Sequence, residues 1–311
     1  MLAVFMGTPP FAVPTLEALH RRGHSIASVI TQPDRPAGRG QKLTPPPVKV
    51  KALELDLPVY QPEKIRTPEA LEHLRKIAPE IIVVVGYGQI IPQTIIDLPR
   101  YGIVNVHSSL LPKYRGAAPI NWAIANGETQ TGVTTMRIEK RLDAGDMLLK
   151  RETAIGPAET APQLAERLAP IGAELLIETL EGLAAGAITP EKQNEAEATY
   201  APILKREDGR IDWQRPAPEI FNRIRGFDPW PGAYTSFRGK RLHVRRVCPL
   251  SGESLPPGAV SIRSGFRAGC GAGTALQLQE LQLEGKQRIL ADDFVRGYRP
   301  AENEVLGETP T

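Results

Sequence analysis

The N-terminal two-thirds of the chain alternates short apolar segments of strand length with segments whose apolar residues recur at helical spacing. We expect strands at residues 2–6, 25–31, 80–85 and 103–107, and helices at residues 48–55, 68–77 and 117–125. Strands that alternate with helices predict an α/β fold with a doubly wound, Rossmann-like, mostly parallel sheet. Such sheets bind ligands beyond the carboxyl ends of their strands, so the residues at these ends are the first candidates for a functional site.

The rest of the chain has a different pattern. Residues 131–138 and 147–155 predict a hairpin, and residues 163–183 predict a long helix. Residues 211–226 predict one further helix, and beyond residue 234 the segments are short, strand-like and separated by glycines. We therefore expect an α/β domain over residues 1–189, a polar linker over 190–207 and a smaller β-barrel (OB-like) domain over 208–311.

Composition limits the class of protein. With 41% hydrophobic and 23% charged residues, the chain is typical of a globular protein. Its longest apolar run, near residues 81–85, is far shorter than the roughly 20 residues that span a bilayer. The first residues lack the basic segment and cleavage site of a secretory leader. Cys248 and Cys270 form no recognisable motif. We expect a reduced, cytoplasmic protein without a membrane segment or an obligate protein partner.

Two kinds of ligand are disfavoured. The first predicted strand leads into Gly7-Thr8-Pro9-Pro10, which has one glycine where a dinucleotide fingerprint has three. Neither proline has an N–H group to offer a phosphate, so we expect no nicotinamide cofactor. The five histidines are scattered along the sequence and predict no metal site.

Three polar residues are candidates for catalysis. Asn105 and His107 are two residues apart in an apolar strand, so their side chains should share one face. An asparagine amide can donate to a carbonyl oxygen that becomes negatively charged, and an imidazole can move a proton. Asp143, in a later loop, would favour the charged form of the imidazole. Each residue also has a structural interpretation, since Asp-Ala-Gly is common in turns and a histidine near a strand end is often only hydrogen-bonded.

These residues resemble the signature of the formyltransferase family that uses 10-formyltetrahydrofolate: Asn-x-His, then Ser-Leu-Leu-Pro, then a distal Asp. The resemblance implies catalytic roles for Asn105, His107 and Asp143. It also implies a pterin pocket, which the loop after residue 85 and the segment after His107 would line. The residues of that pocket would be Gly86, Tyr87, Gly88, Gln89, Ile90, Ser109, Leu110, Leu111 and Pro112.

A long basic segment, residues 31–47, resembles the loop with which the methionyl-tRNA formyltransferases of this family enter the tRNA acceptor stem. We expect it to lack regular structure and to become ordered on binding. Its cations would neutralise phosphates. The resemblance implies that the partner is initiator methionyl-tRNA. It implies tRNA contacts for Arg35, Arg39 and Lys42, and for a basic surface made of Arg238, Lys240, Arg241 and Arg245.

The chain departs from the family pattern at two positions, with Pro10 where an acidic residue is typical and Asp228 where asparagine is common. Other acceptors remain open, because formyltransferases of nucleotide-linked amino sugars and folate hydrolases share the Asn, His and Asp set. A basic arm favours tRNA, since a small acceptor gives no reason for one. An RNA-binding module with a vestigial site is a further alternative.

Overall fold

The computed structural model describes residues 1–38, 40–252 and 254–307. The chain divides into two compact units. The first comprises Met1–Pro119, Gln130–Ala154 and Ala165–Ala201, and the second comprises Ile120–Thr129, Ile155–Leu164 and Pro202–Thr311. The domain division expected from the sequence stays a prediction, and each unit is described by itself.

A seven-stranded sheet, in the order β10-β9-β7-β6-β1-β2-β5, forms the centre of the first unit. Its strands are β1 (Leu2–Gly7), β2 (Ser25–Ile30), β5 (Val59–Tyr60), β6 (Ile81–Val85), β7 (Ile103–His107), β9 (Gln130–Arg137) and β10 (Met147–Ala154). Neighbouring strands are parallel among β5, β2, β1, β6 and β7, in that order across the sheet. β9 is antiparallel to β7, and β10 is antiparallel to β9. The doubly wound, mostly parallel sheet is confirmed, and so is the hairpin of β9 and β10.

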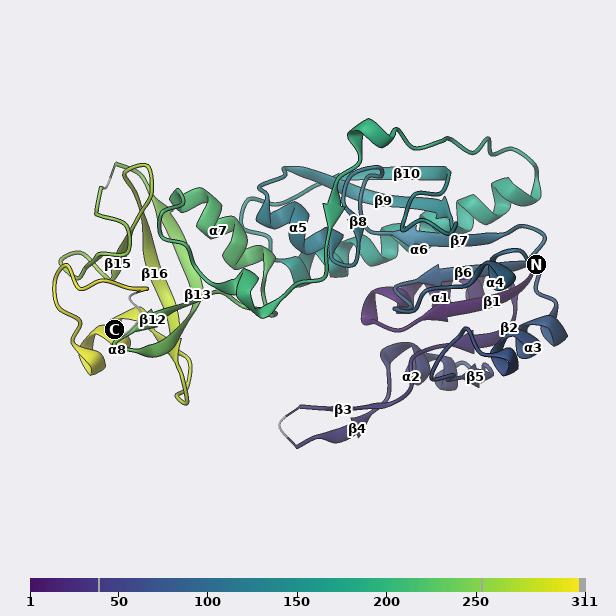
Figure 1. Cartoon of the computed structure of the whole chain (residues 1–311), viewed down its shortest axis with the longest axis horizontal. Coiled ribbons are helices and arrows are strands. Elements are labelled where there is room, and N and C mark those ends of the chain that lie inside the picture. The colour runs from purple at the N-terminus through teal and green to yellow at the C-terminus, as the bar shows by residue number, and fades with distance from the viewer. Residues whose placement is uncertain (39, 253, 308–311) are drawn as a thin grey trace. The chain divides into compact units, whose positions relative to one another are not determined.

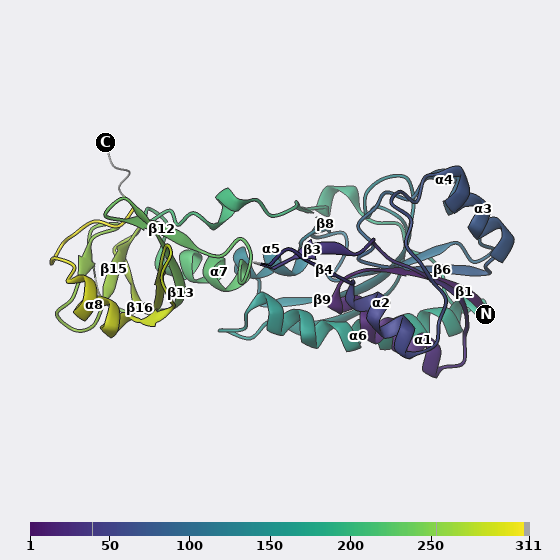
Figure 2. The same ribbon diagram turned by 90° about the horizontal axis from the view of Figure 1, so that it is seen from below.

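Helices cover both faces of this sheet. Figure 2 shows α1, α2 and α6 on one side and α3 and α4 on the other. Their bounds are α1 (Val13–Arg21), α2 (Pro47–Glu54), α3 (Pro68–Ile77), α4 (Gln93–Ile96) and α6 (Ala161–Ala184). The sequence sets the start of α3 clearly, because the hydroxyl of Thr67 accepts a hydrogen bond from the N–H of Ala70 and Pro68 occupies the first turn. Among the described residues, no helix combines the length and apolar character needed to cross a membrane.

Among the described residues of the first unit, four short strands lie outside the main sheet. β3 (Arg35–Ala37) and β4 (Lys42–Thr44) form an antiparallel pair that extends away from the sheet (Figure 1). The expectation of a segment without regular structure is therefore wrong for these residues. β8 (Arg115–Gly116) pairs in parallel with β11 (Tyr200–Ala201). Residues just before β11 thus lie beside the segment that follows β7.

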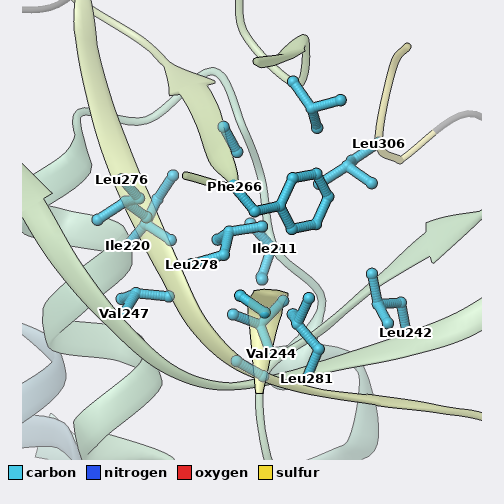
Figure 3. Packing of buried hydrophobic residues seen from close by; sticks show 14 of the residues in the cluster. Ile211, Ile220, Leu242, Val244, Val247, Phe266, Leu276, Leu278, Leu281 and Leu306 are labelled. Carbon is cyan, nitrogen blue, oxygen red and sulfur yellow. The ribbon is translucent and has the colours of Figure 1, made fainter. Parts of the chain in front are cut away.

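The second unit is a curled antiparallel sheet, a half-barrel with the order β12-β13-β16-β15-β14. The strands are β12 (Tyr234–Phe237), β13 (Lys240–Leu250), β14 (Val260–Ser261), β15 (Arg267–Cys270) and β16 (Thr274–Leu283), with β17 (Ile289–Leu290) beside β16. Helices α7 (Ala217–Gly226) and α8 (Ala291–Tyr298) belong to this unit. Figure 3 shows the core, in which Ile220 of α7 lies among Phe266, Leu276 and Leu278.

One expectation for this unit needs correction. The helix expected over residues 211–226 begins only at Ala217. The backbone N–H of Ile211 instead donates to the carbonyl of Tyr234, and the buried Trp213 indole donates to the hydroxyl of Thr235 at 3.0 Å. These bonds tie residues 211–213 to β12 in place of a helix. The sequence patterns also missed β15 and α8.

Candidate active site

The end of β7 carries Asn105 and His107 on one face of the sheet, as the alternation of a strand requires. Helix α6 covers the opposite face, because a Cβ atom at Gly172 would lie 2.8 Å from a methyl carbon of Val106. The side chains of Asn105 and His107 are therefore turned away from α6. They are 9% and 6% exposed, respectively. The carboxyl end of β7 thus presents an amide and an imidazole that are mostly removed from water.

The ring of His107 is fixed by two neighbours. Its Nε2 atom lies 2.9 Å from the carbonyl oxygen of Tyr114, which can only accept, so Nε2 carries a proton. Its Nδ1 atom lies 3.8 Å from Oδ2 of Asp143. That distance is longer than a hydrogen bond, and among the described residues Nδ1 has no other partner. Nδ1 is therefore available to a reacting group, with the Asp143 carboxylate close beside it.

Asp143 lies between β9 and β10. Its Oδ2 atom accepts a hydrogen bond of 2.8 Å from the backbone N–H of Gly116. Its φ angle is +47°, in the left-handed region that asparagine and aspartate tolerate better than most residues. The structure thus brings Asp143 to His107 across a sequence separation that gave no local signal.

Asn105 differs from the other two residues because its side chain makes no hydrogen bond to the described part of the protein. A partly buried amide without a partner is costly unless another group satisfies it. Its two N–H groups are free to donate to a substrate oxygen. This is the arrangement expected of an oxyanion donor.

The loop after β6 is adjacent to this end of β7, since β6 and β7 are parallel neighbours. Gly86 and Gly88 have φ angles of +58° and +82°, which explains the glycines. The side chain of Tyr87 is buried in the core, and burial raises the pKa of its phenol. The side chain of Gln89 bonds to the backbone of Glu63 and Ile65. Ile90, in contrast, is 90% exposed.

The segment after His107 is held by Thr134 of β9, which the sequence did not single out. The Thr134 hydroxyl donates to the carbonyl of Ser109 and accepts from the N–H of Leu111. Leu111 packs with Met136 and Met147, and Pro112 is buried. The hydroxyl of Ser109 donates to the carbonyl of Lys113, whereas Leu110 is half-buried. Of the proposed pocket residues, Gly86, Gly88 and Ile90 are exposed, and Gln89 and Leu110 are half-buried.

The basic residues of the first unit differ in whether their charged groups already have a partner within the protein. Arg35 forms an exposed ion pair of 2.7 Å with Glu63. The ammonium group of Lys42 is exposed and has no partner among the described residues. Arg39 lies outside the described residues.

The basic residues of the second unit differ in the same way. Arg238 is committed to the fold, because it donates to both oxygens of Glu304 and to the carbonyls of Tyr298 and Arg299. The guanidinium of Arg241 lies 4.5 Å from the ring centre of Tyr234, and Arg245 donates to Gln282. Lys240 is exposed, with an ammonium group that contacts no partner in the described part of the chain. Lys240 is therefore the member of this surface most open to a phosphate.

No group of three or more metal-ligating side chains is found within the residues that the structure describes.

Comparison with known proteins identifies the family to which the chain belongs. Residues 1–180 match the formyl transferase family model, and residues 203–299 match the model of the formyl transferase C-terminal domain. The chain therefore belongs to the formyl transferase family.

The most similar relatives narrow this class, since they carry the name methionyl-tRNA formyltransferase. The protein from Solibacter usitatus is 59% identical over 309 residues, which are 99% of each chain. That from Geobacter sulfurreducens is 52% identical over 307 residues, which are 98% of this chain and 96% of the relative.

The fold is also that of more distant solved structures. The N-formyltransferase of Helicobacter canadensis, solved with folinic acid and dTDP-3-aminofucose, matches with a TM-score of 0.68 at 19% identity and covers 90% of this chain and 99% of its own. HypX of Aquifex aeolicus, in complex with tetrahydrofolic acid, matches with a TM-score of 0.65 at 18% identity and covers 98% of this chain and 48% of its own.

Proposed function

We propose that this protein transfers the formyl group of 10-formyltetrahydrofolate to the α-amine of methionyl initiator tRNA, in the cytoplasm, for translation initiation. The observation that supports this most strongly is the identity of more than half over nearly the whole chain with relatives of that name. The catalytic roles rest on Asn105, His107 and Asp143. The co-substrate would be held by the loop after β6 and by the segment after β7, where flexible glycine backbone and an exposed Ile90 favour a flat ligand.

The co-substrate supplies the formyl group, and the protein supplies charge and protons. The free amine attacks the formyl carbon, and the electron pair of the C=O bond moves onto oxygen. The amide of Asn105 donates to this oxygen, and protonated His107 stabilises it from Nδ1. Asp143 balances the charge of His107. When the bond between the formyl carbon and the folate nitrogen breaks, that nitrogen takes up one proton and the new amide has lost one.

Recognition of tRNA is proposed for the exposed cations of both units. The ammonium groups of Lys42 on β4 and Lys240 on β13 have no partner in the described part of the chain, and the sequence adds Arg39. Within residues 1–38, 40–252 and 254–307, the side chains of Arg35, Arg241 and Arg245 each contact one partner and keep further donors, whereas the donors of Arg238 are bound within the fold. The basic pair of strands β3 and β4 suits a polyanion, and a small acceptor would not need it. It therefore favours tRNA over the amino-sugar or hydrolytic alternative.

The proposal is tested by formyl transfer to charged initiator tRNA with His107→Ala beside His20→Ala. His20 is an exposed residue of α1 and serves as the matched control. Loss of general acid–base help predicts a rate lower by about 10² to 10⁴ for His107→Ala, and no change for His20→Ala. A His107→Ala enzyme that keeps its turnover would overturn the catalytic assignment.

A further inference from the structure

Asp143 is held in an uncommon backbone conformation by a residue far away in the sequence. Its φ of +47° is one that an L-residue adopts only when the surroundings favour it. The next residues are also constrained, since Ala144 is buried and a Cβ at Gly145 would lie 2.0 Å from the carbonyl oxygen of Arg137. The position of the Asp143 carboxylate therefore depends on what fixes this loop.

Gln193 supplies two of the contacts that fix it. Its Nε2 atom donates to the carbonyl of Asp143 and to the carbonyl of Gly145, both at 2.8 Å. Gln193 is 8% exposed, so these bonds are largely shielded from water. One side-chain amide thus uses both its N–H groups to hold the two ends of the Asp143–Gly145 turn.

Arg115 sets the orientation of that amide. Its Nε atom lies 2.9 Å from Oε1 of Gln193, and a guanidinium can only donate. The amide oxygen must therefore face Arg115 and the nitrogen must face the loop. Arg115 is 2% exposed, and Glu195 accepts from its Nη1 and Nη2 atoms at 3.0 Å each.

The same segment also contacts the carboxylate. Gly116, directly after Arg115, donates its N–H to Oδ2 of Asp143. A Cβ at Gly116 would lie 2.5 Å from the carbonyl oxygen of Ala201, so this backbone has little room to move. Asp143 is therefore held at its backbone by Gln193 and at its carboxylate by Gly116, and Arg115 joins the two supports.

We propose that Gln193 is a positioning residue for catalysis, which keeps the Asp143 carboxylate at the distance from His107 that formyl transfer requires. This inference rests on the proposed function, which supplies the reaction. Gln193 itself lies outside the set of Asn105, His107 and Asp143. Since 3.8 Å separates the two groups, a shift of about 1 Å changes the interaction strongly, and misplacement of that size costs about 100-fold in rate.

Two variants test the proposal. Gln193→Met removes all hydrogen bonds of the side chain and keeps a side chain of similar length. Gln193→Glu keeps an oxygen for Arg115 and the shape of the side chain, but replaces the donating nitrogen with a carboxylate oxygen. Denaturant unfolding of both variants separates a loss of rate from a failure to fold. Both should lower kcat by about 100-fold while KM for tRNA and for the folate stays within about threefold. The matched control is Gln163→Glu, because the oxygen of exposed Gln163 accepts from Thr160 and its nitrogen has no partner among the described residues.

A double-mutant cycle separates positioning from general damage. If Gln193 acts through Asp143, Gln193→Glu combined with Asp143→Asn should be no slower than Asp143→Asn alone. Losses that multiply, or a kcat of Gln193→Glu within threefold of the wild type, would overturn the proposal. If the wild-type protein formylates another acceptor and not tRNA, the proposed function fails, and the same cycle is measured with that acceptor.

Discussion

Replacing Asn105 with alanine should separate catalysis from stability. The side chain has no hydrogen-bond partner in the described part of the protein, so its removal leaves no other polar group unsatisfied. The free energy of unfolding should therefore change by less than about 1 kcal/mol. The transition state loses an oxyanion donor, which costs about 2.7 to 4 kcal/mol, or 10² to 10³ in kcat.

Asn121→Ala is the matched contrast in the same assays. The Nδ2 atom of Asn121 donates to the carbonyl of Gly226 at 2.8 Å, and removing it leaves that carbonyl without this donor. We expect a loss of about 1 to 3 kcal/mol in unfolding free energy and a rate within about threefold of the wild type. Initial rates of formyl transfer and denaturant unfolding give the two quantities. Equal activity of Asn105→Ala and wild type would refute the oxyanion role.

Three other predictions concern charge and burial. Lys42→Ala should weaken tRNA binding and reduce the steepness of log affinity against log salt concentration by about 1. The control Lys64→Ala, at an exposed lysine, should leave the affinity and this slope unchanged. Filter binding at several salt concentrations measures both quantities. Burial raises the pKa of the Cys270 thiol to about 12, so only exposed Cys248 should react with a thiol reagent until the protein unfolds. Burial, followed by the nearby charges of Arg245, Arg241 and Arg206, lowers the pKa of His243. The unfolded chain then binds the proton more readily, so stability should fall as the pH drops below about 6.5; thermal unfolding of His243→Gln should show a smaller fall.

Much of the first unit could be predicted because its elements follow simple periods. The strand ending at His107 and the helix starting after Thr67 have clear apolar patterns and a clear cap. The shared face of Asn105 and His107 follows from their spacing alone. The contact between His107 and Asp143 needed the resemblance to a family, because residues 36 apart in sequence carry no periodic signal.

The missed features lack any local signal. β3 and β4 are three residues long, too short for a period to be seen. The region of Gln193 was expected to be a linker, and its bonds to Asp143 and Arg115 span 50 and 78 residues. Arg238 counted only as a cation in the sequence, whereas in the fold its donors are taken by Glu304 and two carbonyls. Composition cannot tell a free cation from a committed one.

The most direct test of the account offers the wild-type protein 10-formyltetrahydrofolate with charged initiator tRNA and a nucleotide-linked amino sugar together, and measures each formylated product and tetrahydrofolate. We predict formylmethionyl-tRNA and tetrahydrofolate in equal amounts, with no formylated sugar. Tetrahydrofolate released with a formylated sugar or with free formate, and without formylated tRNA, would contradict the account.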